Sequence, residues 1–141
     1  LLKNRDGLIL AEKTKIKNEH IYYINEGDTI LKSPFLCNIT QVDKVLELSP
    51  NNLYVDFEKL VFPLKLRLWK DGDYFFPSGM KGKKKLSKFF KDEKLSLIAK
   101  EKVWVLLSEN SILWVVGMRS DGRFKVDVKT KHILKITYSE K

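Results

Sequence analysis

The sequence predicts a mostly β domain of the α+β class, in which layered strands are accompanied by one short helical pair. Residues 103–107 and 112–116 are two nearly continuous apolar runs joined by a polar turn, as expected for a central hairpin that is buried on both faces. Other short segments alternate apolar and polar residues between turn signals, which is typical of half-buried strands. Helical spacing of apolar residues is clearest between 86 and 102.

The front of the chain predicts short strands and turns. Residues 1–10 suggest an opening hairpin, because Arg-Asp-Gly stands between two apolar stretches. Residues 20–24 are β-branched and aromatic, and the turn at 25–28 leads back into a strand at 29–31. Pro34 must break that strand or confine it to a sheet edge, since proline cannot donate to a ladder.

The middle of the chain is less regular. Residues 39–48 leave strand and short helix open, although their polar alternation favours a strand. Residues 49–52 (Ser-Pro-Asn-Asn) form the clearest loop and a soft boundary within one domain covering 1–141. Residues 53–57 alternate like a half-buried strand, and 61–69 are predicted to be extended.

The segment from 66 to 90 contains the most distinctive chemistry. An apolar, aromatic strand turns at Asp71-Gly72-Asp73 and continues into a glycine-bounded loop at 77–82. Three consecutive lysines, 83–85, then precede a helix whose apolar side chains share one face. These side chains are spaced i, i+3, i+4: Leu86, Phe89 and Phe90. Because a helix N-terminus is electropositive and glycines let N–H groups turn outward, this element is predicted to bind phosphate.

The back of the chain completes the predicted layers. Ser96 is a candidate N-cap for a second short helix. After the central hairpin, residues 119–123 form a basic turn. Residues 124–128 and 133–138 alternate as two closing strands.

The charge of the chain is concentrated in one quarter of its length. Of a formal net charge of +9, the residues from 65 to 100 supply +7, with 11 basic and 4 acidic side chains. Such a local excess favours a polyanionic partner, because binding to phosphates releases their counterions. A solvated lysine-rich surface is the alternative.

Several classes of function lack a pattern in the sequence. Cys37 is the single cysteine, so neither an intrachain disulfide nor a thiolate metal cluster is expected. His20 and His132 have no neighbours that suggest a triad or a metal site. Asp71 and Asp73 are better explained by turn chemistry than as a catalytic pair. No membrane span and no leader is expected, which favours an intracellular, cytoplasmic protein, and the first residue, Leu1, suggests a piece of a longer chain.

The nucleic-acid hypothesis has its own alternatives. Residues 79–82 spell the GXXG loop of KH domains, but Pro77-Ser78 do not suit the helix that precedes such a loop. The same stretch does not fit a phosphate-binding P-loop. Surface ion pairing is an equal alternative for the three arginines, Arg67, Arg119 and Arg123. The tryptophans lie in apolar strands and are predicted to be core residues (Trp69, Trp104 and Trp114).

Two blocks of the chain resemble the C-terminal domain of tRNA(Ile)-lysidine synthetase. The first block runs through Trp69, Gly72, Asp73, Phe75, Pro77, Gly79, Met80, Lys81, Gly82, Lys84, Lys85, Leu86, Ser87, Phe89 and Phe90. The second runs through Ile112, Trp114, Val115, Gly117, Arg119, Asp121, Arg123, Phe124, Lys125 and Val126. The similarity covers 53–138 well, whereas 1–52 fits by length and strand character only. Ser78 and Lys88 depart from the family's usual leucine and acidic residue.

The resemblance implies a fold similar to a domain of the phenylalanyl-tRNA synthetase β chain, and a role in docking tRNA. The parent enzyme uses ATP and lysine to convert the wobble cytidine of an isoleucine tRNA with a CAU anticodon into lysidine. Its catalytic ATP-pyrophosphatase domain, with ATP and magnesium, is N-terminal and has no counterpart here, so no cofactor and no independent catalysis are expected in this chain. Whether the parent is a homodimer stays open.

The resemblance and the charge together predict a set of RNA-binding residues on the acceptor-stem side of the tRNA. They are Arg67, Lys81, Gly82, Lys83, Lys84, Lys85, Ser87, Lys88, Arg119 and Arg123. The competing hypothesis is a protein-interaction module that packs on the catalytic half of the parent, with its lysines serving as solubilising groups.

Overall fold

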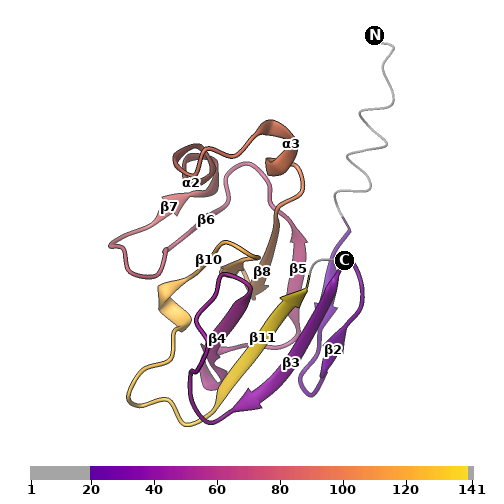
Figure 1. Cartoon of the computed structure of the whole chain (residues 1–141), viewed down its shortest axis with the longest axis vertical. Helices are drawn as coiled ribbons and strands as arrows, with labels where there is room; N and C mark the ends of the chain where they lie inside the picture. The colour runs from indigo at the N-terminus through magenta and orange to yellow at the C-terminus, as the bar shows by residue number, and fades with distance from the viewer. Residues whose placement is uncertain (1–19, 140–141) are drawn as a thin grey trace.

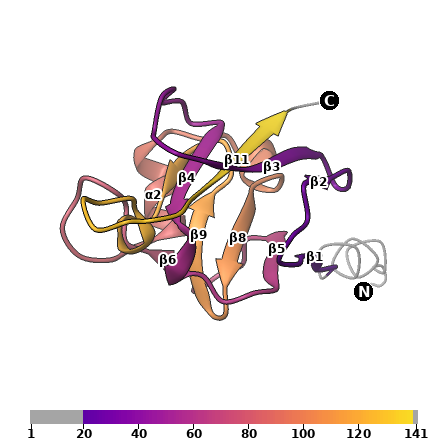
Figure 2. The same cartoon turned by 90° about the horizontal axis from the view of Figure 1, so that it is seen from below.

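The structure is a computed structural model that describes residues 20–139. Two antiparallel sheets lie one over the other, and a layer with two short helices covers the outer face of one of them (Figures 1 and 2). This arrangement confirms the predicted mostly β, layered α+β fold. The hairpin predicted at residues 1–10 lies outside the described residues.

The first sheet has five strands, and the predicted hairpin lies within it. Its order is β1-β5-β8-β9-β10, with all neighbours antiparallel. The bounds are β1 Tyr22–Ile24, β5 Leu64–Leu68, β8 Trp104–Ser108, β9 Ser111–Val115 and β10 Arg119–Ser120. Strands β8 and β9 are joined by a turn in which Glu109 has a φ of 56°.

The second sheet has four strands in the order β2-β3-β11-β4. The bounds are β2 Ile30–Leu31, β3 Leu36–Val42, β4 Asn52–Asp56 and β11 Ile133–Ser139. Strand β2 is an edge strand that ends before Pro34, as predicted. Strand β3 ends at Val42, so residues 43–48 do not continue the strand that the alternation favoured.

The main core fills the space between the two sheets. Its buried side chains come from both, including Leu64, Leu66, Leu106 and Trp114 on one side and Cys37, Ile39, Val55 and Ile136 on the other. A second core lies on the opposite face of the first sheet. There Val105, Leu107, Ile112 and Val115 meet Phe75, Leu86, Phe89 and Phe90. Because β8 and β9 are covered on both faces, their apolar runs are nearly continuous.

The helical layer is built as the spacing predicts. It consists of β6 Tyr74–Phe75, β7 Lys84–Lys85, α2 Leu86–Asp92 and α3 Leu97–Lys100. The three apolar side chains of α2 are at most 3% exposed. Ser96 caps α3, since its Oγ accepts a hydrogen bond from the N–H of Ala99 at 3.1 Å. The indole Nε1 of Trp69 donates to the carbonyl of Lys100 at 2.7 Å and ties this layer to β5.

The strand predicted at 124–128 is wrong. Residues Gly122–Phe124 form the 3₁₀ helix η2, capped by the side chain of Asp121, and an irregular loop follows to residue 132. In that loop the carboxylate of Asp127 accepts the N–H of Lys129 at 2.8 Å, which turns the chain. A second 3₁₀ helix, η1, spans Phe57–Lys59. His20 and His132 stand just before β1 and β11 rather than within strands.

Among residues 20–139, no helix is long and apolar enough to cross a membrane.

Candidate nucleic-acid interface

A buried carboxylate joins the two sequence blocks that carry the basic residues. Asp121 is 1% exposed, and its Oδ2 accepts the main-chain N–H of Phe76 at 2.9 Å. Backbone hydrogen bonds reinforce the junction: the N–H of Gly122 donates to Phe76 O at 2.8 Å, and the N–H of Ser78 donates to Ser120 O at 3.0 Å. The chain around 76–78 therefore holds a fixed position against 120–122.

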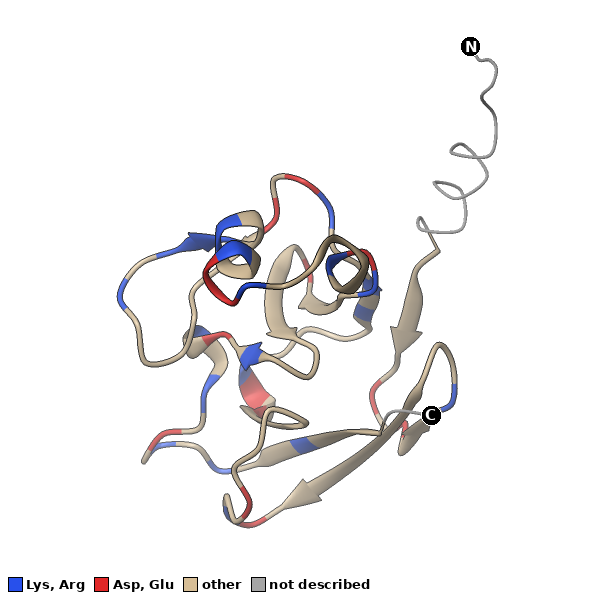
Figure 3. Ribbon diagram, turned by 45° about the horizontal axis from the view of Figure 1, so that its top comes forward, with Lys and Arg blue, Asp and Glu red and all other residues tan. Residues whose placement is uncertain are grey.

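Residues 77–85, here called the basic loop, extend from this junction to the start of α2. Gly79 and Gly82 have φ values of +81° and +77°, a region that other residues rarely adopt, so the glycines shape the loop. Lys81, Lys83 and Lys85 are exposed, and no ion pair within residues 20–139 includes them. Figure 3 shows the resulting concentration of basic residues along this loop, β7 and α2.

One exposed lysine of the basic loop also lies over an aromatic ring. The Nζ of Lys83 is 4.8 Å from the centre of the Tyr74 ring, and Tyr74 is 45% exposed. A cation at this distance from a ring is attracted by its negative face. The contact orients Lys83 while leaving its charge unneutralised.

Two other lysines share an acidic partner. The ammonium of Lys84 forms an ion pair with Asp92, and Lys88 lies 3.7 Å from the other oxygen of the same carboxylate. The hydrogen bond from Lys84, helped by its charge and by Lys88, holds the pKa of Asp92 below its ordinary value. Lys84 and Lys88 are therefore partly neutralised, whereas Lys81, Lys83 and Lys85 are not.

The start of α2 is less open than the sequence suggested. The N–H of Leu86 donates to the carbonyl of Asp73 at 2.9 Å, so this N–H group is not available to a phosphate. Lys85 occupies the N-cap position without a side-chain cap, and Ser87 is exposed in the first turn. The positive side chains, rather than the N–H groups of a seven-residue helix, are the main feature of this surface.

The three predicted arginines have different surroundings. Arg67 is mostly buried and forms a two-pronged ion pair with Asp73, at 2.9 Å and 3.0 Å. The same carboxylate accepts the N–H of Lys70 at 2.8 Å, which confirms its predicted part in the turn. Arg67 thus fixes the turn that precedes the basic loop.

Arg123 and Arg119 lie beside the basic loop. Arg123 donates through Nε and Nη2 to Asp121, at 3.1 Å and 3.0 Å, and its guanidinium lies 4.1 Å above the ring of Phe76. Arg119 Nη1 is 3.6 Å from the sulfur of Met80, within the loop itself. No acidic partner of Arg119 occurs among residues 20–139. The structure therefore brings Arg119 next to lysines that lie some forty residues earlier.

Residues predicted to be bystanders lie apart from this surface. The ring of His20 contacts Tyr22 at a centroid distance of 4.3 Å, and His132 is exposed before β11. Within residues 20–139, no group of three or more His, Cys, Asp or Glu side chains is arranged to hold a metal ion. Trp114 is 2% exposed in the main core, whereas Trp69 and Trp104 pack partly buried against the two cores. The tryptophans are thus core residues, as predicted.

Two features of the interface were missed in the sequence. Asp121 was noted only as part of a block, although its burial and four hydrogen bonds make it the centre of the junction. The loop at 125–132 carries three exposed lysines that were predicted to lie in or near a strand. The spacing of Asp127 and Thr130, a turn signature, was the signal that could have identified this loop.

Comparison with known proteins gives a consistent family. The family model described as the TilS substrate C-terminal domain matches residues 64–136. A tRNA(Ile)-lysidine synthase of Parabacteroides distasonis is 42% identical over 142 residues, covering 98% of this chain and 32% of that protein. One of Caldanaerobacter subterraneus is 34% identical over 147 residues, covering 99% and 31%. The chain thus spans about a third of the length of these curated relatives.

Solved structures share the fold. A crystal structure of a TILS C-terminal domain has a TM-score of 0.69 at 19% identity, covering 86% of this chain and all of that one. An N-terminal fragment of the phenylalanyl-tRNA synthetase β-subunit from Pyrococcus horikoshii has a TM-score of 0.56 at 19% identity, covering 64% of this chain and 28% of that one. Both similarities confirm the fold that the resemblance implied.

Proposed function

The chain belongs to the TilS C-terminal domain family, and we propose that within a tRNA(Ile)-lysidine synthase it binds the isoleucine tRNA. In this proposal the domain contributes affinity and substrate selection by gripping the acceptor-stem side of the tRNA. The conversion of the wobble cytidine to lysidine, with its ATP and magnesium, takes place on a catalytic part of the parent enzyme outside this chain. No cofactor is assigned to the residues described here.

The observation that carries the proposal is the set of exposed lysines without acidic partners. Lys81, Lys83 and Lys85 lie on one short loop next to Arg119, and none has an ion-pair partner within residues 20–139. Unneutralised charges gain most from phosphate, because their binding releases counterions from the nucleic acid. Lysine is a point charge with little directional preference, so these contacts suit backbone phosphates rather than base edges.

The other predicted site residues support the lysines in different ways. Gly82 gives the loop its turn, and Arg67 fixes the preceding turn through Asp73. Arg123 holds the junction through Asp121 and keeps a side chain that is 38% exposed. Ser87 and Lys88 flank the loop on the exposed face of α2. Little base reading is expected, since an RNA stem presents mainly phosphates and 2′-hydroxyls.

The test is a titration of the chain with full-length isoleucine tRNA over a series of salt concentrations. The wild type is compared with a Lys81→Ala/Lys83→Ala/Lys85→Ala variant, in which Lys84 is kept because it pairs with Asp92. Affinity should fall with salt, and the variant should lose about 2 to 3 of the slope of log K against log salt. Equal binding by both proteins would refute the basic loop as the site.

A second candidate function, docking on the catalytic half of the parent enzyme, has one observation in its favour. Leu97 and Ile98 on α3 are 74% and 69% exposed, which is unusual for large apolar side chains that adjoin each other. The apolar strands themselves are buried and not available to a partner. A Leu97→Ser/Ile98→Ser variant that binds tRNA normally but fails to associate with the catalytic half would support this role.

A further inference from the structure

Residues 125–132, here called the lysine loop, carry a second set of positive charges. Lys125, Lys129 and Lys131 are exposed, and no ion pair within residues 20–139 includes them. The acidic residue of the loop, Asp127, is engaged by Lys59 at 3.4 Å. Val128, between these lysines, is fully exposed. The loop therefore presents positive charge that its own carboxylate does not cancel.

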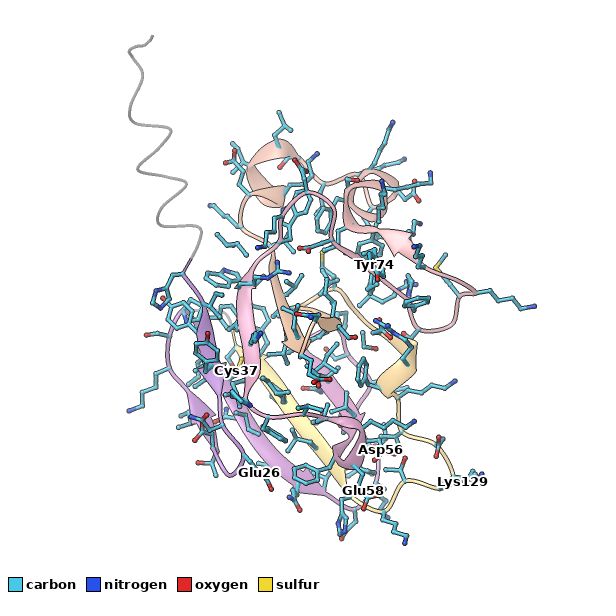
Figure 4. The ribbon with its side chains drawn as sticks, turned by 180° about the vertical axis from the view of Figure 1, so that it is seen from behind. Glu26, Cys37, Asp56, Glu58, Tyr74 and Lys129 are labelled. Carbon is cyan, nitrogen blue, oxygen red and sulfur yellow. The ribbon has the colours of Figure 1, made fainter. Side chains whose placement is uncertain are left out.

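The lysine loop is held in one conformation by hydrogen bonds. The N–H of Asp127 donates to Thr130 Oγ1 at 2.9 Å, and the N–H of Thr130 donates to Asp127 O at 3.0 Å. Thr130 Oγ1 in turn donates to Oδ2 of the buried Asp56 at 3.0 Å. Figure 4 shows Lys129 at the outer edge of the molecule, beyond Asp56 and Glu58. The loop is anchored to β4 at a point where a carboxylate is buried.

The lysine loop and the basic loop project from the same side of the molecule, as two views at right angles show (Figures 1 and 2). Their spacing is fixed by the junction at Asp121. The basic loop is bonded to residues 120–122, and the chain runs from Arg123 directly into Lys125. Arg119 and Arg123 lie in the segment between the two loops. Basic residues mark both loops in Figure 3.

We propose that the lysine loop is a second phosphate-binding element, and that both loops bind the backbone of a single RNA duplex. The inference rests on the proposed function, since that duplex is a stem of the docked tRNA. Two charged elements at a fixed spacing suit a partner whose phosphates also repeat at a fixed spacing. A flexible single strand would gain nothing from the rigid connection, and an A-form stem is recognised through its backbone and shape.

The experiment uses the full chain, isoleucine tRNA and a blunt RNA hairpin as probes, in a salt series. Lys129→Ala/Lys131→Ala should weaken binding to both probes about 3- to 10-fold and lower the salt slope by about 1 to 2. The matched control, Lys32→Ala/Lys102→Ala, removes two exposed lysines that follow β2 and α3. It should change affinity less than about twofold. Acetylation of lysines, read by mass spectrometry, should show Lys129 and Lys131 protected by RNA.

The outcomes separate the two proposals. If the basic-loop variant loses affinity while Lys129→Ala/Lys131→Ala binds like the wild type and both lysines stay unprotected, the lysine loop is refuted and the proposed function stands. An equal loss in the matched control would mean that net charge, rather than this surface, decides binding, and would also overturn the inference. If the wild type binds neither probe, both proposals fail.

Discussion

The N–H of Phe76 donates a 2.9 Å hydrogen bond to the carboxylate of Asp121, across 45 residues of sequence. This contact joins the loop that carries Lys81, Lys83 and Lys85 to the segment that carries Arg119 and Arg123. Asp121 is also bonded to the main chain and the guanidinium of Arg123. The basic surface is therefore held together by a negative charge buried beneath it.

Replacement of Asp121 should destabilise the domain. Asp121→Ala leaves the N–H of Phe76 and the guanidinium of Arg123 without their acceptor, and should lower the free energy of unfolding by about 2–4 kcal/mol. Asp121→Asn keeps the shape and should cost about half as much. Urea unfolding followed by the fluorescence of buried Trp114 measures both. Asp28→Ala, at an exposed turn, is the control and should cost less than about 1 kcal/mol. Equal losses at 28 and 121 would contradict the role of the junction.

The pair Arg67–Asp73 should be a structural contact. Both side chains are largely buried and joined by two hydrogen bonds, so a double-mutant cycle with Arg67→Ala and Asp73→Ala should give a coupling free energy of about 1–3 kcal/mol. In the folded Arg67→Lys variant, tRNA affinity should stay within about twofold of the wild type. A loss of tenfold with unchanged stability would instead assign Arg67 to direct RNA contact.

Removal of the carboxylate of Asp92 should improve RNA binding. Asp92→Asn releases Lys84 and Lys88 from their shared partner, and should raise affinity for tRNA by about two- to fivefold at low salt. The gain should shrink as salt is added. Glu101→Gln makes the same change in net charge at an exposed site after α3, and should have a smaller effect. An equal gain at both positions would point to overall charge alone.

The thiol of Cys37 should be inert in the folded protein. Burial raises the pKa of Cys37 from 9.0 to about 12, because the charged thiolate is not solvated in the core. A thiol reagent at pH 8 should therefore label Cys37 only at the rate of unfolding. The raised pKa also means that stability from this group is present below pH 9 and is lost between about pH 9 and 12. A Cys37→Ala variant should lack this component of the alkaline decline, and rapid labelling of the native protein would contradict the burial.

The local features of the fold were predictable because each depends on residues close in sequence. The spacing of Leu86, Phe89 and Phe90 marked the buried face of α2, and Ser96 marked the start of α3. The hairpin at 103–116 was predicted from apolar runs that only a strand covered on both faces would carry. The prediction failed at 124–128, where alternation resembled a strand but the side chains of Asp121 and Asp127 turn the backbone. Local side-chain hydrogen bonds prevailed over periodicity there.

By itself the sequence determined the mostly β class, the position of the basic quarter and the identity of its lysines, since composition, periodicity and turn residues act locally. Only the tertiary structure decided which of these charges are available. It paired Arg67 with Asp73 and Lys84 with Asp92, and it brought Arg119 to Met80. It also placed the lysine loop on the same side as the basic loop. The physical reason is that a charge is neutralised by whatever the fold brings within a few ångströms, and sequence separation does not limit that contact.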